Sequence, residues 1–125
     1  MTTDLETLNC WTQRIIGCAY SVSNTLGAGF LEKVYENALA HELRKIGLRA
    51  TQQQPLHVLY DGVVVGDYVA DLIVEGSIIL ELKAAKAFDD IHFAQCINYL
   101  KATRMRICLL INFGQPKIEI KRFAN

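Results

Sequence analysis

Two acids and a lysine in the middle of the chain have the types and the spacing of a reactive centre. The segment YVADLIVEGSIILELKAAK holds Asp71, then Glu81 ten positions later, and Lys83 two positions after that. Paired carboxylates suit Mg²⁺, which keeps several waters and binds phosphate oxygens of a substrate. An ammonium group beside them can orient or deprotonate a water and stabilise charge that develops on a phosphate. The three residues therefore point to metal-assisted phosphate chemistry.

A hairpin is the element that would bring these side chains together. A three-residue loop over 75–77 sets Val74 opposite Ile78, and this register sets Asp71 opposite Glu81. Asp71, Glu81 and Lys83 are then expected to project from the same face of the sheet. Opposed Cβ atoms lie about 5 Å apart, and two charges at that distance repel by roughly 3 kcal/mol at an effective dielectric of about 20. A divalent cation would remove the repulsion. The spacing alone leaves a second interpretation open, in which Lys83 forms an ion pair with either acid on a solvated sheet face.

A second group of polar residues lies on a helix predicted over residues 89–103. Gln95 and Tyr99 are four positions apart and share a helical face, and His92 lies one turn before them. A glutamine amide can bind both a water and a phosphate oxygen. The alternative is that Gln95 and Tyr99 satisfy each other or a backbone group, and that His92 is an ordinary hydrogen-bonded histidine.

A third group lies at the start of an earlier helix, in the pattern Gly29-x-x-Glu32-x-x-Tyr35, with Glu36 next in the chain. Glu32, Tyr35 and Glu36 fall on one helical stripe. Glu32 has two possible roles. It could cap the first turn of the helix, where a negative charge is favourable, or it could complete the outer shell of the metal.

Hydrophobic periodicity predicts two helices in the first part of the chain. Apolar residues recur at helical spacing over residues 5–25, and a glycine-rich stretch then ends the helix. A second helix is expected over residues 30–46, with inward-facing residues Phe30, Val34, Ala38 and Leu43.

The rest of the chain predicts strands around one further helix. Asp61-Gly62 is a strong hairpin signal, Pro55 suits an edge strand, and the run RICLLINFG is typical of a strand buried on both faces. The expected strands are residues 51–60, 63–74, 78–86, 106–112 and 117–123. Helix 89–103 is a crossover that allows strand 106–112 to pair in parallel. The order is α-α-β-β-β-α-β-β, which predicts an α/β fold with a central mixed sheet flanked by helices, in a single domain over residues 1–125.

Charge is balanced overall but divided along the chain. Residues 1–82 hold five Lys or Arg against ten Asp or Glu, and residues 83–125 hold eight against three. Zero net charge predicts weak, salt-sensitive binding to nucleic acid, with contacts at Lys86, Lys101 and Arg104 beside Lys83. Solvated faces without a partner explain the same division.

Two further features bear on the compartment. No signal sequence and no apolar stretch of membrane-spanning length is recognisable, so a cytoplasmic protein without a membrane partner is expected. The four cysteines lack zinc-site spacing and are predicted to be buried free thiols.

The residues described above resemble those of a known family. Gly29-x-x-Glu32-x-x-Tyr35 is similar to the signature of the GxxExxY proteins, a prokaryotic family assigned to the PD-(D/E)XK nuclease superfamily. The resemblance covers residues 14–122 and includes ADLIVEGSIILELKA, AQCINYLKAT and LLINFG in the expected order. It implies the restriction-endonuclease-like fold, although Ala70 stands where the superfamily pattern has proline.

The same resemblance implies roles for individual residues. Asp71 and Glu81 would bind Mg²⁺ or Mn²⁺, with Glu32 or Glu36 assisting, and Lys83 would be catalytic. Gln95 and Tyr99 match the QxxxY pattern of RecB-type nucleases, which supports the active site from the helix that follows.

The resulting hypothesis is a Mg²⁺- or Mn²⁺-dependent nuclease that hydrolyses DNA phosphodiester bonds, with a homodimer possible. One rival is a catalytically inactive module of the same fold that binds nucleic acid or a protein partner, although such a module would be expected to lose at least one site residue. Another is a metal-stabilised structural subunit of a larger assembly.

Overall fold

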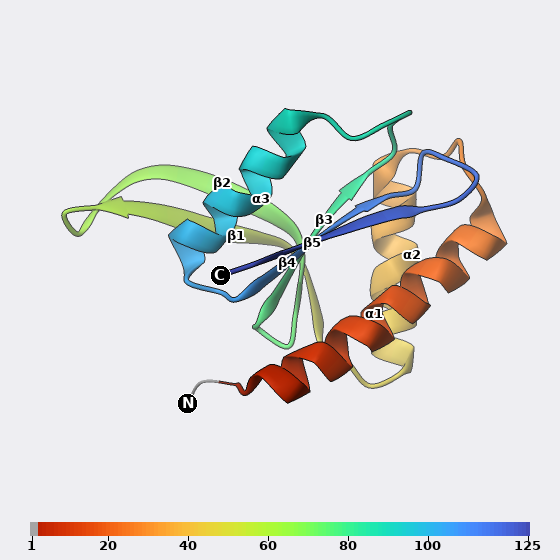
Figure 1. Cartoon of the computed structure of the whole chain (residues 1–125), viewed down its shortest axis with the longest axis horizontal. Coiled ribbons are helices and arrows are strands. Elements are labelled where there is room, and N and C mark those ends of the chain that lie inside the picture. The colour runs from red at the N-terminus through yellow and green to blue at the C-terminus, as the bar shows by residue number, and fades with distance from the viewer. Residues whose placement is uncertain (1–2) are drawn as a thin grey trace.

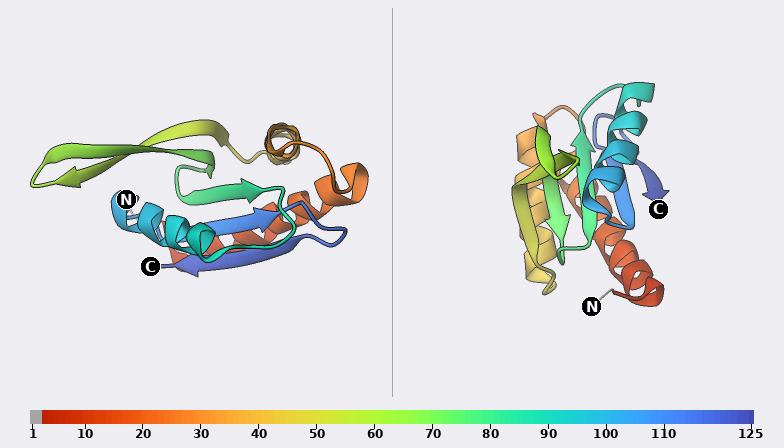
Figure 2. Two further views of the ribbon diagram at one scale, coloured as in Figure 1. Left: turned by 90° about the horizontal axis from the view of Figure 1, so that it is seen from above. Right: turned by 90° about the vertical axis from the view of Figure 1, so that its left-hand side faces the viewer.

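A five-stranded sheet separates two helices on one face from a single helix on the other in the computed structural model, which describes residues 3–125 (Figures 1 and 2). The predicted element order is confirmed. The elements are α1 (Leu5–Leu26), α2 (Glu32–Lys45), β1 (Ala50–Tyr60), β2 (Val63–Val74), β3 (Ile78–Lys83), α3 (Asp90–Thr103), β4 (Ile107–Asn112) and β5 (Glu119–Ala124).

The sheet is mixed, as predicted. Its strand order is β1-β2-β3-β4-β5, with β3 and β4 parallel and the other neighbours antiparallel. Helix α3 supplies the crossover that a parallel pair requires. All six residues of β4 are buried because strands flank it on both sides and helices cover both faces. Pro55 lies in β1, which is an edge strand.

Two cores form on opposite faces of the sheet. Helices α1 and α2 pack on one face, where Leu72 of β2 and Leu80 of β3 are fully buried. Helix α3 packs on the other face, where Ile79 of β3 and Cys108 of β4 are fully buried. The alternation along β3 follows from the two-residue period of a strand. The end of β3, which carries Glu81 and Lys83, therefore lies between two helical layers.

Helix α2 begins two residues later than predicted, and of the residues predicted to face inward only Leu43 is fully buried. Phe30 is 48% exposed and Val34 is 36% exposed, so the prediction that they face inward is wrong. The buried stripe contains Tyr35, Leu39 and Leu43, and the Tyr35 ring stacks on a core phenylalanine at 4.7 Å. The large aromatic ring fills the interior more effectively than the valine before it.

The hairpin of β1 and β2 extends beyond the rest of the sheet (Figures 1 and 2). Asp61 and Gly62 both have positive φ, 54° and 77°, which the tight turn at its tip requires. Leu59 and Tyr60 near the tip are 62% and 71% exposed. The hairpin is therefore a projecting arm, and only its base belongs to the two cores.

Two other features concern the cysteines and the helices. Cys18, Cys96 and Cys108 are buried free thiols as predicted, but Cys10 is exposed because its side of α1 faces outward. Within residues 3–125, none of the helices has the length and hydropathy of a membrane span.

Candidate active site

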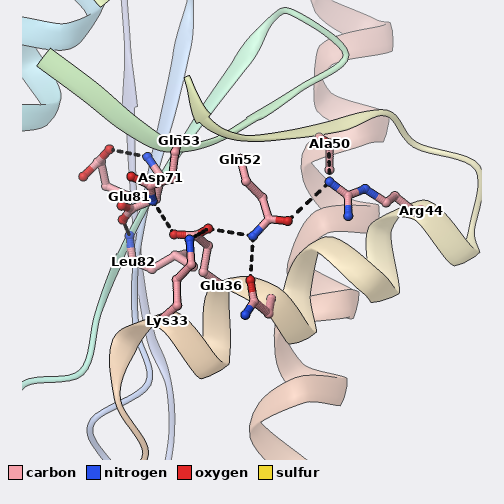
Figure 3. A network of polar contacts seen from close by, with 10 residues as sticks. Lys33, Glu36, Arg44, Ala50, Gln52, Gln53, Asp71, Glu81 and Leu82 are labelled. Atoms are coloured by element: carbon pink, nitrogen blue, oxygen red, sulfur yellow. Dashed lines mark hydrogen bonds and ion pairs between the residues drawn. The ribbon is translucent and has the colours of Figure 1, made fainter. Parts of the chain in front are cut away.

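The two acids lie side by side where β2 and β3 separate. Val74 pairs with Ile78, as the loop length predicted, and the ladder ends at the pair Leu72 and Leu80, which adjoin Asp71 and Glu81 in the chain. The Asp71 backbone N–H donates to Glu81 Oε1 at 3.2 Å, and the Leu82 backbone N–H donates to Asp71 Oδ2 at 2.8 Å (Figure 3). Each carboxylate therefore holds the backbone of the neighbouring strand.

Strand β2 changes the face of its side chains at Asp71. Ala70 and Leu72 are two positions apart, yet Ala70 packs in the α3-side core and Leu72 in the core beneath α1 and α2. The break lies opposite Gln53 of β1, whose φ of 53° is in the left-handed region. Strict alternation could not predict this irregularity, which turns the Asp71 side chain toward α2 and Glu36. Lys83 lines a hollow on the α3 side, so the prediction that Asp71, Glu81 and Lys83 share one face is wrong.

Burial and neighbouring negative charges raise the pKa of both acids. Burial is the main cause of the raised pKa of Asp71; the Leu82 N–H opposes it, and the Glu36 charge adds to it. The pKa of Glu81 rises to about 8, first through burial and then through the negative charge of Asp71. Lys83 acts in the opposite direction on both acids. The pair is thus short of positive charge even with a lysine beside it.

Glu36 of α2 is a buried acid whose importance the sequence underrates. Only 3% of it is exposed. Its carboxylate accepts from Lys33 at 2.8 Å, Gln52 at 2.7 Å and Gln53 at 2.5 Å (Figure 3). The glutamine amides come from the irregular part of β1 opposite Asp71. The sequence offered two hints, the place of Glu36 on the same predicted stripe as Tyr35 and the assisting role that the family resemblance implied for Glu32 or Glu36.

Tyr35 holds the loop between α1 and α2, which leads to Glu36. Its hydroxyl donates to the Gly27 backbone carbonyl at 2.6 Å and accepts from the Phe30 backbone N–H at 3.2 Å. The loop between α1 and α2 includes Gly29, whose φ of 111° favours glycine. The Gly29-x-x-Glu32-x-x-Tyr35 pattern therefore sets the position at which α2 starts, and with it the position of Glu36.

Helix α3 supplies the opposite wall of the site. Gln95 Nε2 donates to the Tyr99 hydroxyl at 2.8 Å, and that hydroxyl lies 3.4 Å from the Val69 backbone carbonyl of β2. Burial, followed by the Glu81 charge, raises the pKa of Tyr99. The two residues satisfy each other, as one interpretation of the sequence held, and they do so next to Glu81.

The segment after Lys83 is held by a residue that sequence reasoning missed. Asn112 is fully buried at the end of β4, and its side-chain amide bonds both the N–H and the carbonyl of Ala85, at 3.0 and 2.9 Å. Gly114 packs so closely that an added Cβ would lie 2.2 Å from the Ala85 oxygen. A polar residue at the end of an apolar run was the available signal. This contact fixes the backbone just beyond Lys83.

Two hollows of different charge flank the acids. On the α2 side, an acidic pocket of about 200 Å³ is lined by Glu32, Lys33, Glu36, Gln53, Asp71 and Leu82. On the α3 side, a second hollow of about 440 Å³ has Lys83, His92, Gln95 and Tyr99 in its lining and no carboxylate. The site thus opens toward carboxylates on one side and toward a lysine and neutral polar groups on the other.

The remaining predicted residues fall in different places. Glu32 begins α2 but makes no capping hydrogen bond, and it lines the acidic pocket. His92 caps α3 by accepting from the Asp89 N–H at 3.1 Å. Lys86 is exposed and lines neither hollow, although its backbone carbonyl accepts from Gln115. Lys101 and Arg104, near the end of α3, line a further hollow, described below.

A family model described as the PD-(D/E)XK nuclease superfamily matches residues 9–123, nearly the whole chain. The chain belongs to the PD-(D/E)XK nuclease superfamily. No curated protein and no solved structure gives a significant match. The match is to the superfamily, and the GxxExxY resemblance stays a prediction.

PD-(D/E)XK nucleases generally depend on a divalent metal ion. Within residues 3–125, no three His, Cys, Asp or Glu side chains are arranged to hold a metal ion. The donor chemistry nevertheless fits a hard cation, because Asp71 and Glu81 offer only oxygen atoms and their pKa values are raised by burial and by neighbouring carboxylates. Glu36 is already bonded to two glutamines and a lysine. Its carboxylate is therefore better suited to supporting the residues around a metal ion than to binding the ion directly.

Proposed function

We propose that this PD-(D/E)XK protein hydrolyses phosphodiester bonds of DNA with Mg²⁺ or Mn²⁺ held between Asp71 and Glu81. The observation that carries the proposal is the buried pair itself. Two acids in backbone contact, one of them with a pKa raised to about 8, face a shortage of positive charge that one lysine does not meet. A divalent cation would supply that charge and would bind a phosphate oxygen of the substrate.

The chain's own residues would perform the positioning. Asp71 and Glu81 supply oxygen ligands, and Glu36 holds Gln52 and Gln53 at the α2 side of Asp71. Glu32 lines the same pocket and adds negative charge near Asp71. The acidic pocket is therefore the side from which the cation would be held.

Lys83 is assigned to the chemical step. Hydrolysis adds a water oxygen to phosphorus and releases one ester oxygen, so a proton must leave the water and another must reach the leaving oxygen. The Lys83 side chain lines the α3-side hollow, where its ammonium would orient the water and stabilise charge on the phosphate oxygens. Gln95 and Tyr99 line the same hollow, where a glutamine amide can bind both a water and a phosphate oxygen.

The proposal is tested by an assay on end-labelled single-stranded, duplex and branched DNA with Mn²⁺ or Mg²⁺. Wild type should cleave at least one form, and Lys83→Ala should not do so at a comparable rate. The matched control is Lys121→Ala, because Lys121 is exposed on β5, outside both hollows. If wild type cleaves no form of DNA or RNA, yet binds nucleic acid equally well with and without Lys83, the protein is a binding module of the same fold.

A further inference from the structure

A further hollow of about 420 Å³ continues the α3-side hollow of about 440 Å³ along α3. Tyr68 and Asn98 line both hollows. Together they form what we call the α3 groove, bounded by α3 on one side and by the β1–β2 arm on the other. Figure 1 shows this helix beside the arm. The groove therefore runs from the proposed catalytic lysine to the far end of α3.

The α3 groove is positively charged. Lys83 lies at one end and Lys101 and Arg104 at the other, and no Asp or Glu lines either hollow. The acidic pocket on the α2 side has three carboxylates in its lining. A polyanion would be attracted to the α3 groove and repelled by the acidic pocket.

The arm wall of the groove offers an aromatic face instead of charge. Tyr68 is 43% exposed, and its ring meets Tyr99 in an edge-on contact at 5.4 Å and 62°. Val58 and Leu59 of the arm line the hollow beside it. An accessible aromatic ring next to basic residues is the combination on which unpaired bases stack while their phosphates bind cations.

We propose that the α3 groove binds a single strand of nucleic acid, with a base stacked on Tyr68 and phosphates at Lys101 and Arg104. The strand would enter the site at Lys83, and in this part the inference rests on the proposed function. Residues 91–103 of α3 span about 18 Å at 1.5 Å per residue. At about 3.4 Å per phosphate along one strand, that length holds about five nucleotides, and fewer if the strand is extended.

The distribution of charge on the arm argues against a duplex. No lysine or arginine occurs between Arg49 and Lys83, and the one histidine of the arm, His57, lies against Asp67 at 2.6 Å, so the arm offers no free cation to a phosphate. A duplex lying across α3 and the arm would meet cations on one side only. Its bases would also be stacked on each other, leaving no free face for Tyr68. A single strand needs only the cations already present along α3.

Binding is measured with a fluorescein-labelled dT12 strand and with a hairpin duplex of equal charge, by anisotropy in Ca²⁺ and again in EDTA. A gel confirms that the DNA remains intact. The single strand should bind more tightly than the duplex. Tyr68→Ala should weaken single-strand binding about 5- to 150-fold, the range for loss of one base–aromatic stack, and Tyr68→Phe should retain it. Tyr20→Ala is the matched control, because Tyr20 is 41% exposed on α1.

Salt dependence tests the phosphate contacts separately. Each phosphate contact with a single strand contributes about −0.7 to the slope of log binding constant against log salt concentration. Contacts at Lys83, Lys101 and Arg104 should therefore give a slope of about −2. Lys101→Ala should reduce the steepness by about 0.7, while Lys121→Ala on β5 should leave it unchanged. Circular dichroism of each variant shows that the chain is folded.

Three results would overturn the inference: no binding to either DNA, equal or tighter binding to the duplex, or Tyr68→Ala behaving like Tyr20→Ala. These results are distinguishable from failure of the proposed hydrolysis. Tyr68-dependent strand binding without cleavage in Mn²⁺ would support the groove and contradict the nuclease. Cleavage of duplex DNA that is indifferent to Tyr68→Ala would support the nuclease and contradict the groove.

Discussion

The acidic pocket, lined by Asp71, and the α3 groove, lined by Lys83, lie on the α2 and α3 sides of the acid pair and are built in opposite ways. The acidic pocket is small, and its buried Glu36 is bonded to three side chains. The α3 groove is larger and has an aromatic ring and three cations in its lining. The acidic pocket is therefore suited to a compact cation, and the α3 groove to an extended anion. Asp71 belongs to the first side, Lys83 to the second, and Glu81 lies between them.

The largest expected effect separates the two sides by function. Lys83→Ala should lower turnover by about 10²–10³, the range for loss of one preorganised stabilising group. Metal affinity should survive or improve, because a positive charge leaves the vicinity of Asp71 and Glu81. Single-turnover cleavage kinetics and a metal-dependent thermal shift measure the two quantities on one sample, with Lys121→Ala as the control. Loss of the thermal shift together with the rate would place Lys83 on the metal side.

Asp71→Asn should have the complementary effect. A metal that binds only the folded state stabilises it by about 2.7 kcal/mol at one hundred times its dissociation constant, and the variant should lose that gain. The metal-free variant should be as stable as wild type or more so, since asparagine can still accept from the Leu82 N–H and the repulsion from Glu81 is relieved. Differential scanning fluorimetry with and without Mg²⁺ measures both. An unchanged metal shift would remove Asp71 from the site.

The pH dependence of stability tests the burial of Glu81. Because its pKa is raised from 4.5 to about 8 on folding, its protonation favours the folded state. That contribution is complete below about pH 4.5 and is lost as pH rises to 8. Glu81→Gln should therefore stabilise the metal-free protein by about 1–3 kcal/mol at pH 8, and by much less at pH 5. Urea unfolding in EDTA at both pH values checks the sign, and an equal gain at both would contradict it.

A further prediction concerns the backbone that holds Lys83. Gly114→Ala would put a Cβ against the backbone of Ala85, at a destabilisation of about 1–3 kcal/mol, and should displace the segment after Lys83. Gly17→Ala is the control, because a Cβ there meets nothing within 4 Å. Thermal unfolding measures stability, and a rate loss in Gly114→Ala without a lost metal shift would locate the damage on the Lys83 side.

The smallest expected effect is that of Gln95→Ala. Its amide bonds Tyr99 from the next turn of α3, so the variant should fold normally and cleave only several-fold more slowly. Circular dichroism and the cleavage assay measure this. A rate as low as that of Lys83→Ala would move Gln95 into the chemical step.

The fold could be predicted from the sequence because its signals are local. Turn residues such as Asp61 and Gly62, the periodicity of α1, and the continuous apolar run of β4 each specify an element independently of the rest of the chain. The length of loop 75–77 likewise specified the register that brings Asp71 beside Glu81.

The parts that sequence reasoning missed depend on contacts between distant segments. The irregularity at Gln53 and Asp71 joins β1 to β2, and the hydrogen bonds between Asn112 and Ala85 join the end of β4 to the loop after β3, 27 positions away. Phe30 and Val34 failed as core residues because helix phase alone could not show that Tyr35 would fill the interior. The acidic pocket and the α3 groove follow from such contacts, so neither was visible as a unit in the sequence.

The division of the site into a cation side at Asp71 and a phosphate side at Lys83 is tested most directly by a Mn²⁺ titration. The cleavage rates of wild type, Asp71→Asn and Lys83→Ala are measured as functions of the Mn²⁺ concentration. Lys83→Ala should lower the plateau by about 10²–10³ and leave the half-saturating Mn²⁺ concentration unchanged or lower. Asp71→Asn should raise the half-saturating concentration. A half-saturating concentration that rises in Lys83→Ala and stays constant in Asp71→Asn would contradict the division into a cation side and a phosphate side.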